Sequence, residues 1–476
     1  MSIMKIGWAS ADITPERTCN LRGQHHVRIS EGVNDPLTAT VLVLESEGEH
    51  AVMFSLDGLG ARSNTLDAIR ENLKGKCDGL DPMKVFGSGT HTHSAPSQGK
   101  DNYPPQADDV ITPEGYGAFL AAKIAAAVEE AWEKRAPGGI GFGTDYAYVG
   151  CNRRMTKLSG ESIMYGNTND EQFSHIEGDE DHTVNILTTY DGDGGLTGVV
   201  VNVACPSQVT EGDMFVSADY WHDTRVEIRS RLGEDLFILP QCSAAGDQSP
   251  HMMIGRKAQA RMLNLRGDVE MTENERATLE MRMAHRRDIG RRMADALDRA
   301  LPLIKNDIRT EPVLRHETVT VSMPKRMVTS EEKDMALEKV REAEEGLAKA
   351  DEDPTAFDYS RHYIYVRYFG AVVNRFETQD AEPVLPMEMH VVRLADVAFA
   401  TNRFELFLDY GQRMKARSRA LQTFLVQLAG DGTYLPSQKA VDARSYGAGI
   451  ESNLVGPEGG QVLVEETVKV INSMFE

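Results

Sequence analysis

Short apolar runs alternate with amphipathic segments along the first third of the chain. Residues 38–45, 51–57 and 84–88 are rich in β-branched and apolar side chains, which predicts three strands. Residues 65–73 and the alanine-rich residues 116–132 have the spacing of helices. Strands that alternate with helices predict an α/β fold, whose sheet we expect to be mixed, largely parallel and flanked by helices.

The same pattern returns later in the chain. Residues 198–204 and 236–239 predict two strands, with a helix over residues 221–232 between them. Residues 389–394 and 397–400 predict two further strands that are joined by a short turn. No internal repeat, low-complexity linker or clean domain boundary is visible. The length allows two to three domains or one large α/β core equally.

Charged helical segments occupy the intervening residues 255–385. One or two long helices are expected over residues 255–305, and another runs from the N-cap candidate Ser330 until Pro354 stops it. Charged residues on such helices are typical of solvated faces rather than of chemistry. We therefore expect a charged helical insertion within a single catalytic domain that spans all 476 residues.

Charge and composition limit the partners of the protein. The 73 acidic and 51 basic side chains give a formal net charge of -22, which repels nucleic acid and anionic membranes. No run of about 18 apolar residues is present, so stable membrane insertion is not expected. The five cysteines form no C-x-x-C pair and the start resembles no secretory signal, which predicts a cytoplasmic protein. The sequence predicts no oligomeric state.

The strongest candidate for chemistry is the pair His91 and His93, which follows the predicted strand 84–88. Residues two apart in an extended segment point to the same face, so the two imidazoles can share a cation. Zinc favours neutral nitrogen ligands, with further His, Cys or carboxylate ligands from distant positions. Ligand sites of α/β folds collect at the carboxyl ends of strands, which favours a metal site over two surface histidines.

A second candidate is the segment GDQSP at residues 246–250, which follows the predicted strand 236–239. Asp247 could orient a metal-bound histidine, and Ser249 could donate a hydrogen bond to a substrate carbonyl or oxyanion. An ordinary Asp/Ser turn is the alternative. The segment is not the G-x-S-x-G elbow, which argues against a conventional serine hydrolase.

Five more polar residues are weaker candidates. Asp57 ends a predicted strand, Glu405 follows another, and Tyr434 lies in a loop. The alternative roles are a cap or ion pair for Asp57, a helix start for Glu405 and packing for Tyr434. Arg28 and Arg153 could hold a polar or anionic substrate group, with a surface salt bridge as the alternative.

Together these segments resemble the neutral, non-lysosomal ceramidase family, in its metal-binding catalytic domain. The similarity is strongest at residues 89–96, GTHTHSAP, which resembles the family's signature. Matching motifs in the same order cover about residues 5–250 and 390–465. The other matching motifs are GWASADITP at 7–15, NDPL at 34–37, Asn152-Arg153, Ser217-Ala218-Asp219, GDQSP at 246–250, Glu405 and Tyr434.

The resemblance implies a zinc ion held by a third histidine and by His91, His93, Glu405 and Tyr434. In the family that third histidine precedes the Asp of a Ser-Asp pair, and counting back from Asp219 leads to Cys205. The resemblance therefore implies Cys205 as a zinc ligand, and a thiolate would make the metal a poorer Lewis acid. The alternatives are that His222 takes this place, or that the metal differs or is lost.

These expectations combine into a zinc-dependent hydrolase that cleaves an amide or ester bond with metal-activated water. Asp57 or Asp247 would orient a ligand or accept a proton, and Ser249 would bind the substrate oxygen. We expect a small-molecule or lipid-like substrate, and none of the β-sandwich domain that larger family members carry. One alternative is a hydrolase of a polar or carbohydrate substrate on the same scaffold. Another is a metal-free binding protein, which the departure at Cys205 keeps open.

Overall fold

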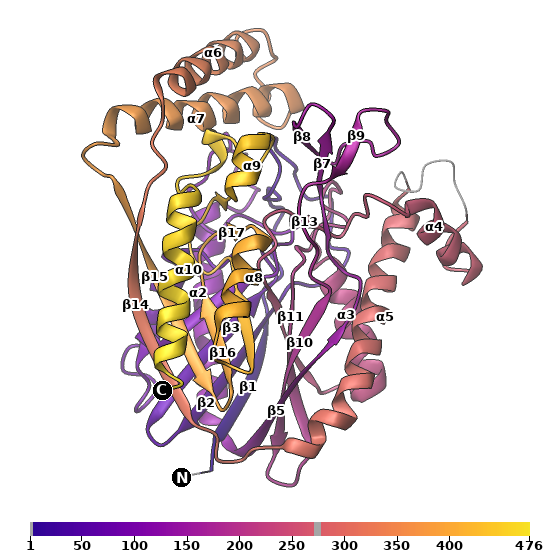
Figure 1. The fold of residues 1–476 in the computed structure, drawn as a ribbon, viewed down its shortest axis with the longest axis vertical. Coiled ribbons are helices and arrows are strands. Elements are labelled where there is room, and N and C mark those ends of the chain that lie inside the picture. Colours follow the sequence, from indigo (N-terminus) through magenta and orange to yellow (C-terminus); the bar gives the residue numbers. More distant parts are fainter. Residues whose placement is uncertain (1–2, 271–277) are drawn as a thin grey trace.

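Two β-sheets lie face to face in the computed structural model, which describes residues 3–270 and 278–476. Helices cover the outer face of each sheet, so the fold has four layers. Helices α5 and α10 lie on opposite sides of the sheets in Figure 1. Among the described residues, no helix combines the length and apolar character that crossing a bilayer requires.

The larger sheet has eight strands in the order β12-β11-β10-β5-β1-β2-β3-β4. Two neighbouring pairs, β3–β4 and β11–β12, are parallel, and the other five pairs are antiparallel. The strands are β1 (Lys5–Asp12), β2 (Thr38–Ser46), β3 (Glu49–Leu56), β4 (Val85–Gly89), β5 (Ala136–Tyr146), β10 (Thr183–Asp191), β11 (Leu196–Val203) and β12 (Phe237–Cys242).

The sequence prediction of a mixed α/β fold is confirmed, but the expected predominance of parallel strands in this sheet is wrong. The reason lies in the connections. A tight turn forces antiparallel pairing, and β2 reaches β3 through Glu47 and Gly48, both with positive φ. The two parallel pairs are those whose strands are joined through helices α1 (Ser63–Leu73) and α3 (Tyr220–Leu232).

The outer face of this sheet is covered by two groups of helices. Helices α1 and α2 (Pro113–Glu133) pack on one half, and α3 and α5 (Leu279–Ile304) pack on the other. In α2 the side chains of Leu120, Ile124 and Val128 are buried at four-residue spacing. Their apolar stripe explains why this sequence forms a helix that lies flat on the sheet.

The smaller sheet has the order β14-β15-β16-β18, and one of its faces packs on the larger sheet. Phe399 and Phe424 stack between the sheets with their ring centroids 4.4 Å apart. Burying one such side chain stabilises the fold by roughly 1.5–3 kcal/mol. The strands are β14 (Leu314–Pro324), β15 (Val384–Leu394), β16 (Val397–Thr401) and β18 (Gln422–Val426), and the helices on the outer face are α8 (Leu408–Arg417) and α10 (Pro457–Ser473).

Residues 255–385 contribute both to the core and to a projecting part. Helix α5 covers the larger sheet and β14 pairs along its whole length with β15, so this part of the expected insertion belongs to the core. Helices α6 (Ser330–Leu347) and α7 (Phe357–Thr378) pack on each other and project at the top of Figure 1. The N-cap of α6 is Thr329 rather than Ser330, because Thr329 and Glu332 form a capping box. Within the helical prediction, residues 271–277 lie outside the described residues.

Several short elements connect the layers at the level of the candidate site. Strand β13 pairs with β6, and β17 pairs in parallel with β19. Their bounds are β6 (Cys151–Asn152), β7 (Arg154–Lys157), β8 (Ser162–Met164), β9 (Phe173–Ile176), β13 (Gln248–Ser249), β17 (Glu405–Leu406), β19 (Tyr434–Leu435), α4 (Arg256–Leu265) and α9 (Gln438–Ala443).

Candidate functional site

The histidine segment follows the carboxyl end of β4, where β3 and β4 lie side by side. His91 has φ 65°, a left-handed conformation that is uncommon for residues other than glycine. Its backbone N–H donates to the carbonyl of Gly58 at 2.9 Å. A Cβ atom on Gly89 would lie 2.5 Å from the Cα of Gly60. The close approach of these two segments therefore requires glycine and fixes the direction of the His91 side chain.

His91 faces the carboxylate of Glu405. Its Nδ1 lies 2.8 Å from the carbonyl oxygen of Leu59, which can only accept, so Nδ1 carries a proton. The other nitrogen, Nε2, lies 3.2 Å from Glu405 Oε2. Burial acts to raise the pKa of Glu405, but the charge and hydrogen bond of His91, and the hydroxyl of Tyr434, hold that pKa below its usual value. The pair is thus suited to hold a cation or a proton between its facing atoms.

Glu405 is brought to Tyr434 by the pairing of β17 with β19, where the two residues are direct partners. The Tyr434 hydroxyl accepts a hydrogen bond from Arg153 Nη2 at 3.1 Å and interacts with Glu405 on its other side. Arg153 also donates to the carbonyl of Gly246 at 2.9 Å. Burial raises the pKa of the Tyr434 hydroxyl well above its usual value, with the charge of Glu405 adding to the shift.

His93 lies beside His91, with the two ring centroids 5.1 Å apart. Its Nε2 is 2.7 Å from the side-chain amide of Gln208. Its Nδ1 lies 3.4 Å from Glu211 Oε2, but the geometry does not complete a hydrogen bond. Burial, with smaller contributions from the positive charges of His91 and Arg28, holds the pKa of His93 well below its usual value. His93 is therefore a neutral imidazole with one unsatisfied nitrogen.

Glu211 is a site residue that the sequence analysis missed. Its carboxylate lies between His93 and His251, 3.8 Å from Nε2 of the latter. Burial raises the pKa of Glu211 to about 7, although Arg153 opposes the shift. A carboxyl group that titrates near neutral pH is suited to proton transfer. Glu211 lies in the loop between β11 and α3, where no motif marked it in the sequence.

Asp57 is not a neighbour of the His91–Glu405 pair, but it contacts the backbone and side chains that hold the histidine segment in place. Its carboxylate accepts hydrogen bonds from Arg225 at 2.7 and 3.0 Å and from the backbone N–H of Thr38 at 2.9 Å. Thr90 Oγ1 donates to it at 3.3 Å. Asp57 is fully buried, so the structure gives this carboxylate a role in holding Thr90 and thereby His91.

Asp247 and Ser249 are placed differently from each other. The two oxygens of Asp247 accept from Asn152 Nδ2 and from the backbone N–H of Leu408, both at 2.9 Å, which ties two loops together. Ser249 Oγ accepts from the hydroxyl of Tyr165 at 3.0 Å. Tyr165 in turn interacts with Arg153, so Ser249 lies at the edge of the cluster rather than at its centre.

Arg28 is a structural residue of the site. Its guanidinium donates to the backbone carbonyls of His93, Asp213 and Arg22, at 2.5, 2.9 and 3.3 Å. The side chain is 1% exposed. Arg28 therefore fixes the backbone of His93 instead of pointing to a substrate.

Cys205 lies in the apolar core, where it packs with Tyr220 and Trp221. Its thiol is 3.4 Å from the carbonyl of Pro206, and burial raises the pKa of the thiol well above its usual value. Among the contacts described for these residues, none joins Cys205 to His91 or Glu405. His222, the alternative ligand, lies beside Asp35 and Asp223 instead.

The structure thus brings together five predicted residues: His91, His93, Glu405, Tyr434 and Arg153. Throughout the described part of the chain, no three side chains of the types His, Cys, Asp and Glu form a group that could hold a metal ion. A metal at this site therefore depends on the phenol oxygen of Tyr434 in addition to His91 and Glu405.

A pocket opens beside His91 and Glu405, with an empty volume of about 640 Å³ that is partly open to solvent. Its wall consists mainly of polar side chains and of glycines, with Leu59, Pro96 and Leu428 as the apolar members. The charged residues that line it, besides Glu405 and His91, are Arg22, Arg62, Arg403 and Asp431.

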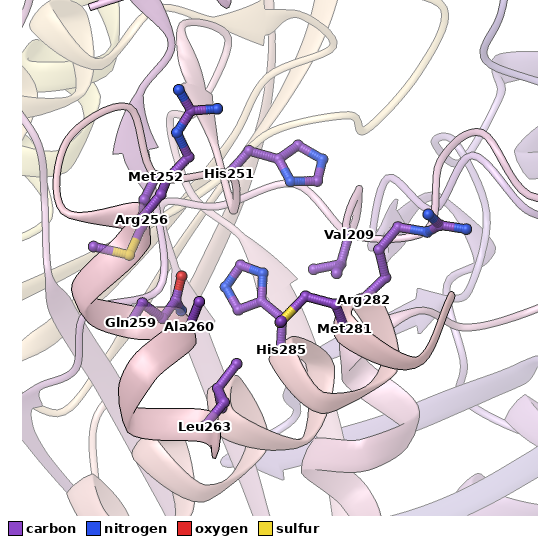
Figure 2. A pocket seen from close by; sticks show the side chains of 10 residues that line it. All are labelled: Val209, His251, Met252, Arg256, Gln259, Ala260, Leu263, Met281, Arg282 and His285. Atoms are coloured by element: carbon purple, nitrogen blue, oxygen red, sulfur yellow. The ribbon is translucent and has the colours of Figure 1, made fainter. Parts of the chain in front are cut away.

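A second pocket, of about 460 Å³, lies between α4 and α5 and has a more apolar wall. Figure 2 shows His251 and His285 among the side chains that line it, with Met281 beside His285 and Leu263 below. His251 links this pocket to Glu211, and through Glu211 to His93. The pocket is therefore adjacent to the candidate site but separate from the pocket that His91 lines.

Comparison with solved structures agrees with the fold predicted from the sequence resemblance. The crystal structure of neutral ceramidase from Pseudomonas aeruginosa matches with a TM-score of 0.68 at 16% identity, over 99% of this chain and 75% of that chain. A structure described as ceramidase complexed with C2 matches with a TM-score of 0.68 at 15% identity and the same coverage. No family model and no curated protein matches the sequence. The neutral ceramidase-like fold is thereby confirmed, and an identity this low bears on the fold alone.

Proposed function

We propose that the protein is a metal-dependent hydrolase that cleaves an amide or ester bond beside His91 and Glu405. The observation that carries this proposal is the 3.2 Å separation of His91 Nε2 and Glu405 Oε2, while His91 Nδ1 is committed to Leu59. A neutral imidazole would then turn a lone pair toward a carboxylate, which is repulsive unless a metal ion or a second proton on His91 lies between them. Two tetrahedral zinc ligands, each about 2.0–2.1 Å from the metal, are roughly 3.3 Å apart, which fits this separation.

Zinc would be held by His91, Glu405 and Tyr434, with His93 beside them. The hydrogen bond from His91 to the Leu59 carbonyl is typical of a metal-binding histidine, because it fixes the tautomer and the ring orientation. When bound, the ion would polarise the substrate carbonyl and lower the pKa of a water molecule. The proposal does not use Cys205, whose thiol is packed in the core.

The remaining residues of the cluster would handle charge and protons. Arg153 donates a hydrogen bond to the Tyr434 oxygen. The positive charge of Arg153 would stabilise negative charge that develops on the substrate during the reaction. Glu211, with a pKa of about 7, can take up and release a proton at neutral pH. His93 lies between His91 and Glu211, with its Nδ1 3.4 Å from the Glu211 carboxylate.

The test is hydrolysis of two isosteric amides, N-acetylglycine and N-isobutylacetamide, together with their octanoyl and palmitoyl analogues. Release of the primary amine is measured with fluorescamine for the zinc-replete protein. We expect the wild type to release amine, and His91→Ala to lower the rate by at least about 100-fold, as for loss of a residue at a reaction centre. His175→Ala, at an exposed histidine, is the matched control and should hydrolyse like the wild type. Absence of hydrolysis for the whole panel, or full activity of His91→Ala, contradicts the proposal.

A further inference from the structure

The pocket beside His91 and Glu405 holds more positive than negative charge. We propose that it selects substrates that carry a small anionic group, such as a carboxylate, next to the bond that is cleaved. This inference rests on the proposed function, since it names the substrate class of the same site. Three arginines line the pocket, against two carboxylates.

Both carboxylates of the pocket are already engaged. Glu405 faces His91, as described above. Asp431 forms an ion pair with Arg62, with 2.7 Å between Oδ1 and Nε. Burial acts to raise the pKa of Asp431, but Arg62 outweighs it and keeps this pKa below its usual value. Arg62 is thus paired, and the wall keeps Arg22 and Arg403 against the single carboxylate of Glu405, an excess of one positive charge.

Arg403 is the first of the two arginines in the pocket wall that are not ion-paired with a carboxylate of the described residues. Its Nε donates to the backbone carbonyl of Asp431, which orients the guanidinium. The Asp431 carboxylate, which is paired with Arg62, also attracts the Arg403 charge. A Cβ atom on Gly432 would lie 1.7 Å from the Arg403 carbonyl oxygen, and Gly430 has φ 128°. These glycines let the loop pack directly against Arg403, so its position is fixed before any ligand binds. Fixing a guanidinium in advance reduces the entropy that a ligand must overcome.

Arg22 is the second. Its backbone N–H donates to the carbonyl of Ala95 at 2.9 Å, which holds it beside the histidine segment. Its guanidinium carbon lies 5.2 Å from the centroid of the Tyr103 ring. An aromatic face supports a guanidinium and leaves its edge donors for a planar anion. In the described part of the chain, no ion pair with a carboxylate is found for the side chains of Arg22 and Arg403.

The excess of positive charge in the pocket contrasts with the negative charge of the whole molecule. With a net charge of -22, the protein repels anions at long range. A pocket that collects arginines in such a protein is unlike its surroundings, and charge-assisted hydrogen bonds from arginine to carboxylate are among the strongest available. The pocket therefore fits a substrate with an anionic group beside the bond that is cleaved.

The test is direct binding of two anions, succinate and inorganic phosphate, by isothermal titration calorimetry at low ionic strength. Succinamide is the neutral counterpart of succinate. We expect at least one anion to bind, succinamide to bind at least about tenfold more weakly than succinate if succinate is the ligand, and added salt to weaken binding. The stronger anion identifies whether the pocket prefers a carboxylate or a phosphate.

Arginine variants connect the binding to this pocket. In the double variant Arg22→Gln and Arg403→Gln, anion binding should fall by at least about tenfold, the loss typical of one hydrogen bond to a charged group. Arg419→Gln, at an exposed arginine paired with Glu476, is the control and should bind like the wild type. Circular dichroism checks that each variant is folded.

The inference is overturned if neither anion binds to the wild type, or if the folded double variant binds as tightly as the wild type. Its failure differs from failure of the proposed function. Hydrolysis without anion binding, with N-isobutylacetamide cleaved as fast as N-acetylglycine, sinks this inference alone. Anion binding that depends on Arg22 and Arg403, in a protein that hydrolyses nothing, leaves the inference standing and removes the proposed function.

Discussion

Two buried histidine clusters in this protein have similar members and different surroundings. One is the His91–His93 cluster, with Glu405 and Arg153. The other, here called the inter-sheet cluster, consists of His316, His390, Glu388 and Arg70. In it His316 Nε2 lies 3.0 Å from His390 Nδ1, and His390 Nε2 lies 2.8 Å from Glu388 Oε1.

The difference is in how completely each cluster is satisfied. His316 Nδ1 contacts the carbonyl of His50 at 3.2 Å, so each nitrogen of the two rings has a protein partner. Glu388 is paired in turn, because Arg70 donates to it at 2.6 Å. At the candidate site His93 keeps an unsatisfied nitrogen, and His91 and Glu405 line a pocket. A fully paired network stabilises a core, whereas unpaired buried groups at a pocket are available to a ligand. Histidines near carboxylates therefore indicate a site only where this pairing is incomplete.

The largest expected difference is between two carboxamide variants. Glu405→Gln should lower kcat/KM by at least about 100-fold. Glu388→Gln, its match in the inter-sheet cluster, should keep kcat/KM near the wild-type value and lower the melting temperature. Steady-state kinetics and thermal unfolding of both variants measure this. Equal loss of activity in the two variants would contradict the assignment of a catalytic role to the His91–His93 cluster and of a stabilising role to the inter-sheet cluster.

Removing a ring from the inter-sheet cluster should affect stability. His390→Leu leaves His316 Nε2 without its partner, while Glu388 keeps its ion pair with Arg70. An unsatisfied buried polar group costs about 1–3 kcal/mol. We expect urea unfolding to show a loss of that size. His93→Gln, which replaces a ring that already has an unsatisfied nitrogen, should lose less stability. A larger loss for His93→Gln than for His390→Leu contradicts this assignment.

The inter-sheet cluster should also make stability depend on pH. Burial, with the charge of His390, lowers the pKa of His316 to about 3, while an unfolded histidine titrates near 6.5. The unfolded chain therefore binds a proton first, and stability falls as the pH drops from 6.5 toward 3, by up to roughly 1.4 kcal/mol per pH unit.

Glu388 acts in a lower range. Burial opposes the shift, but His390 and Arg70 lower its pKa to about 2, so its contribution is present above pH 4.5 and is lost as the pH falls through 2. The histidine effect thus dominates between pH 6.5 and 4.5. Urea unfolding at several pH values in that range should give a smaller slope for His316→Asn than for the wild type. An unchanged slope would show that His316 is not the responsible group.

Cys205→Ala should have the smallest effect. Because the thiol packs in the core, its loss should lower the free energy of unfolding by about 1 kcal/mol and leave kcat/KM unchanged. If hydrolysis or the bound metal is lost instead, Cys205 is a ligand, as the sequence resemblance implies. Activity, metal content and urea unfolding of the same preparation distinguish the two outcomes.

The sequence predicted the elements of the fold better than their pairing. The predicted strand 84–88 corresponds to β4 at Val85–Gly89, because a short apolar run is a local signal. Whether strands run parallel depends on their connections. Tight turns join the antiparallel pairs β2–β3 and β10–β11, whereas long segments join β1 to β2 and β5 to β10. The helices of the charged segment 255–385 could be predicted from its pattern. That α5 packs on the core could not, because its packing partners are distant in the sequence.

The candidate site was predictable where a motif marked it. His91, His93, Glu405, Tyr434 and Arg153 were recognised through motifs, and the structure brings them together. Glu211, Arg22 and Arg403 were missed, because an ordinary loop residue acquires its role only from its neighbours in space. The contacts of Asp57, Asp247 and Cys205 could not be predicted either. Their partners lie far away in the sequence, as Arg225 does from Asp57 and Asn152 from Asp247.

Whether His91 and Glu405 hold a metal ion is tested by the zinc content of purified, zinc-replete protein after dialysis. We expect about one zinc ion per chain for the wild type and for Glu388→Gln, and its loss in His91→Ala and Glu405→Gln. A wild-type protein without zinc, or a Glu405→Gln variant that retains the ion, would contradict this expectation.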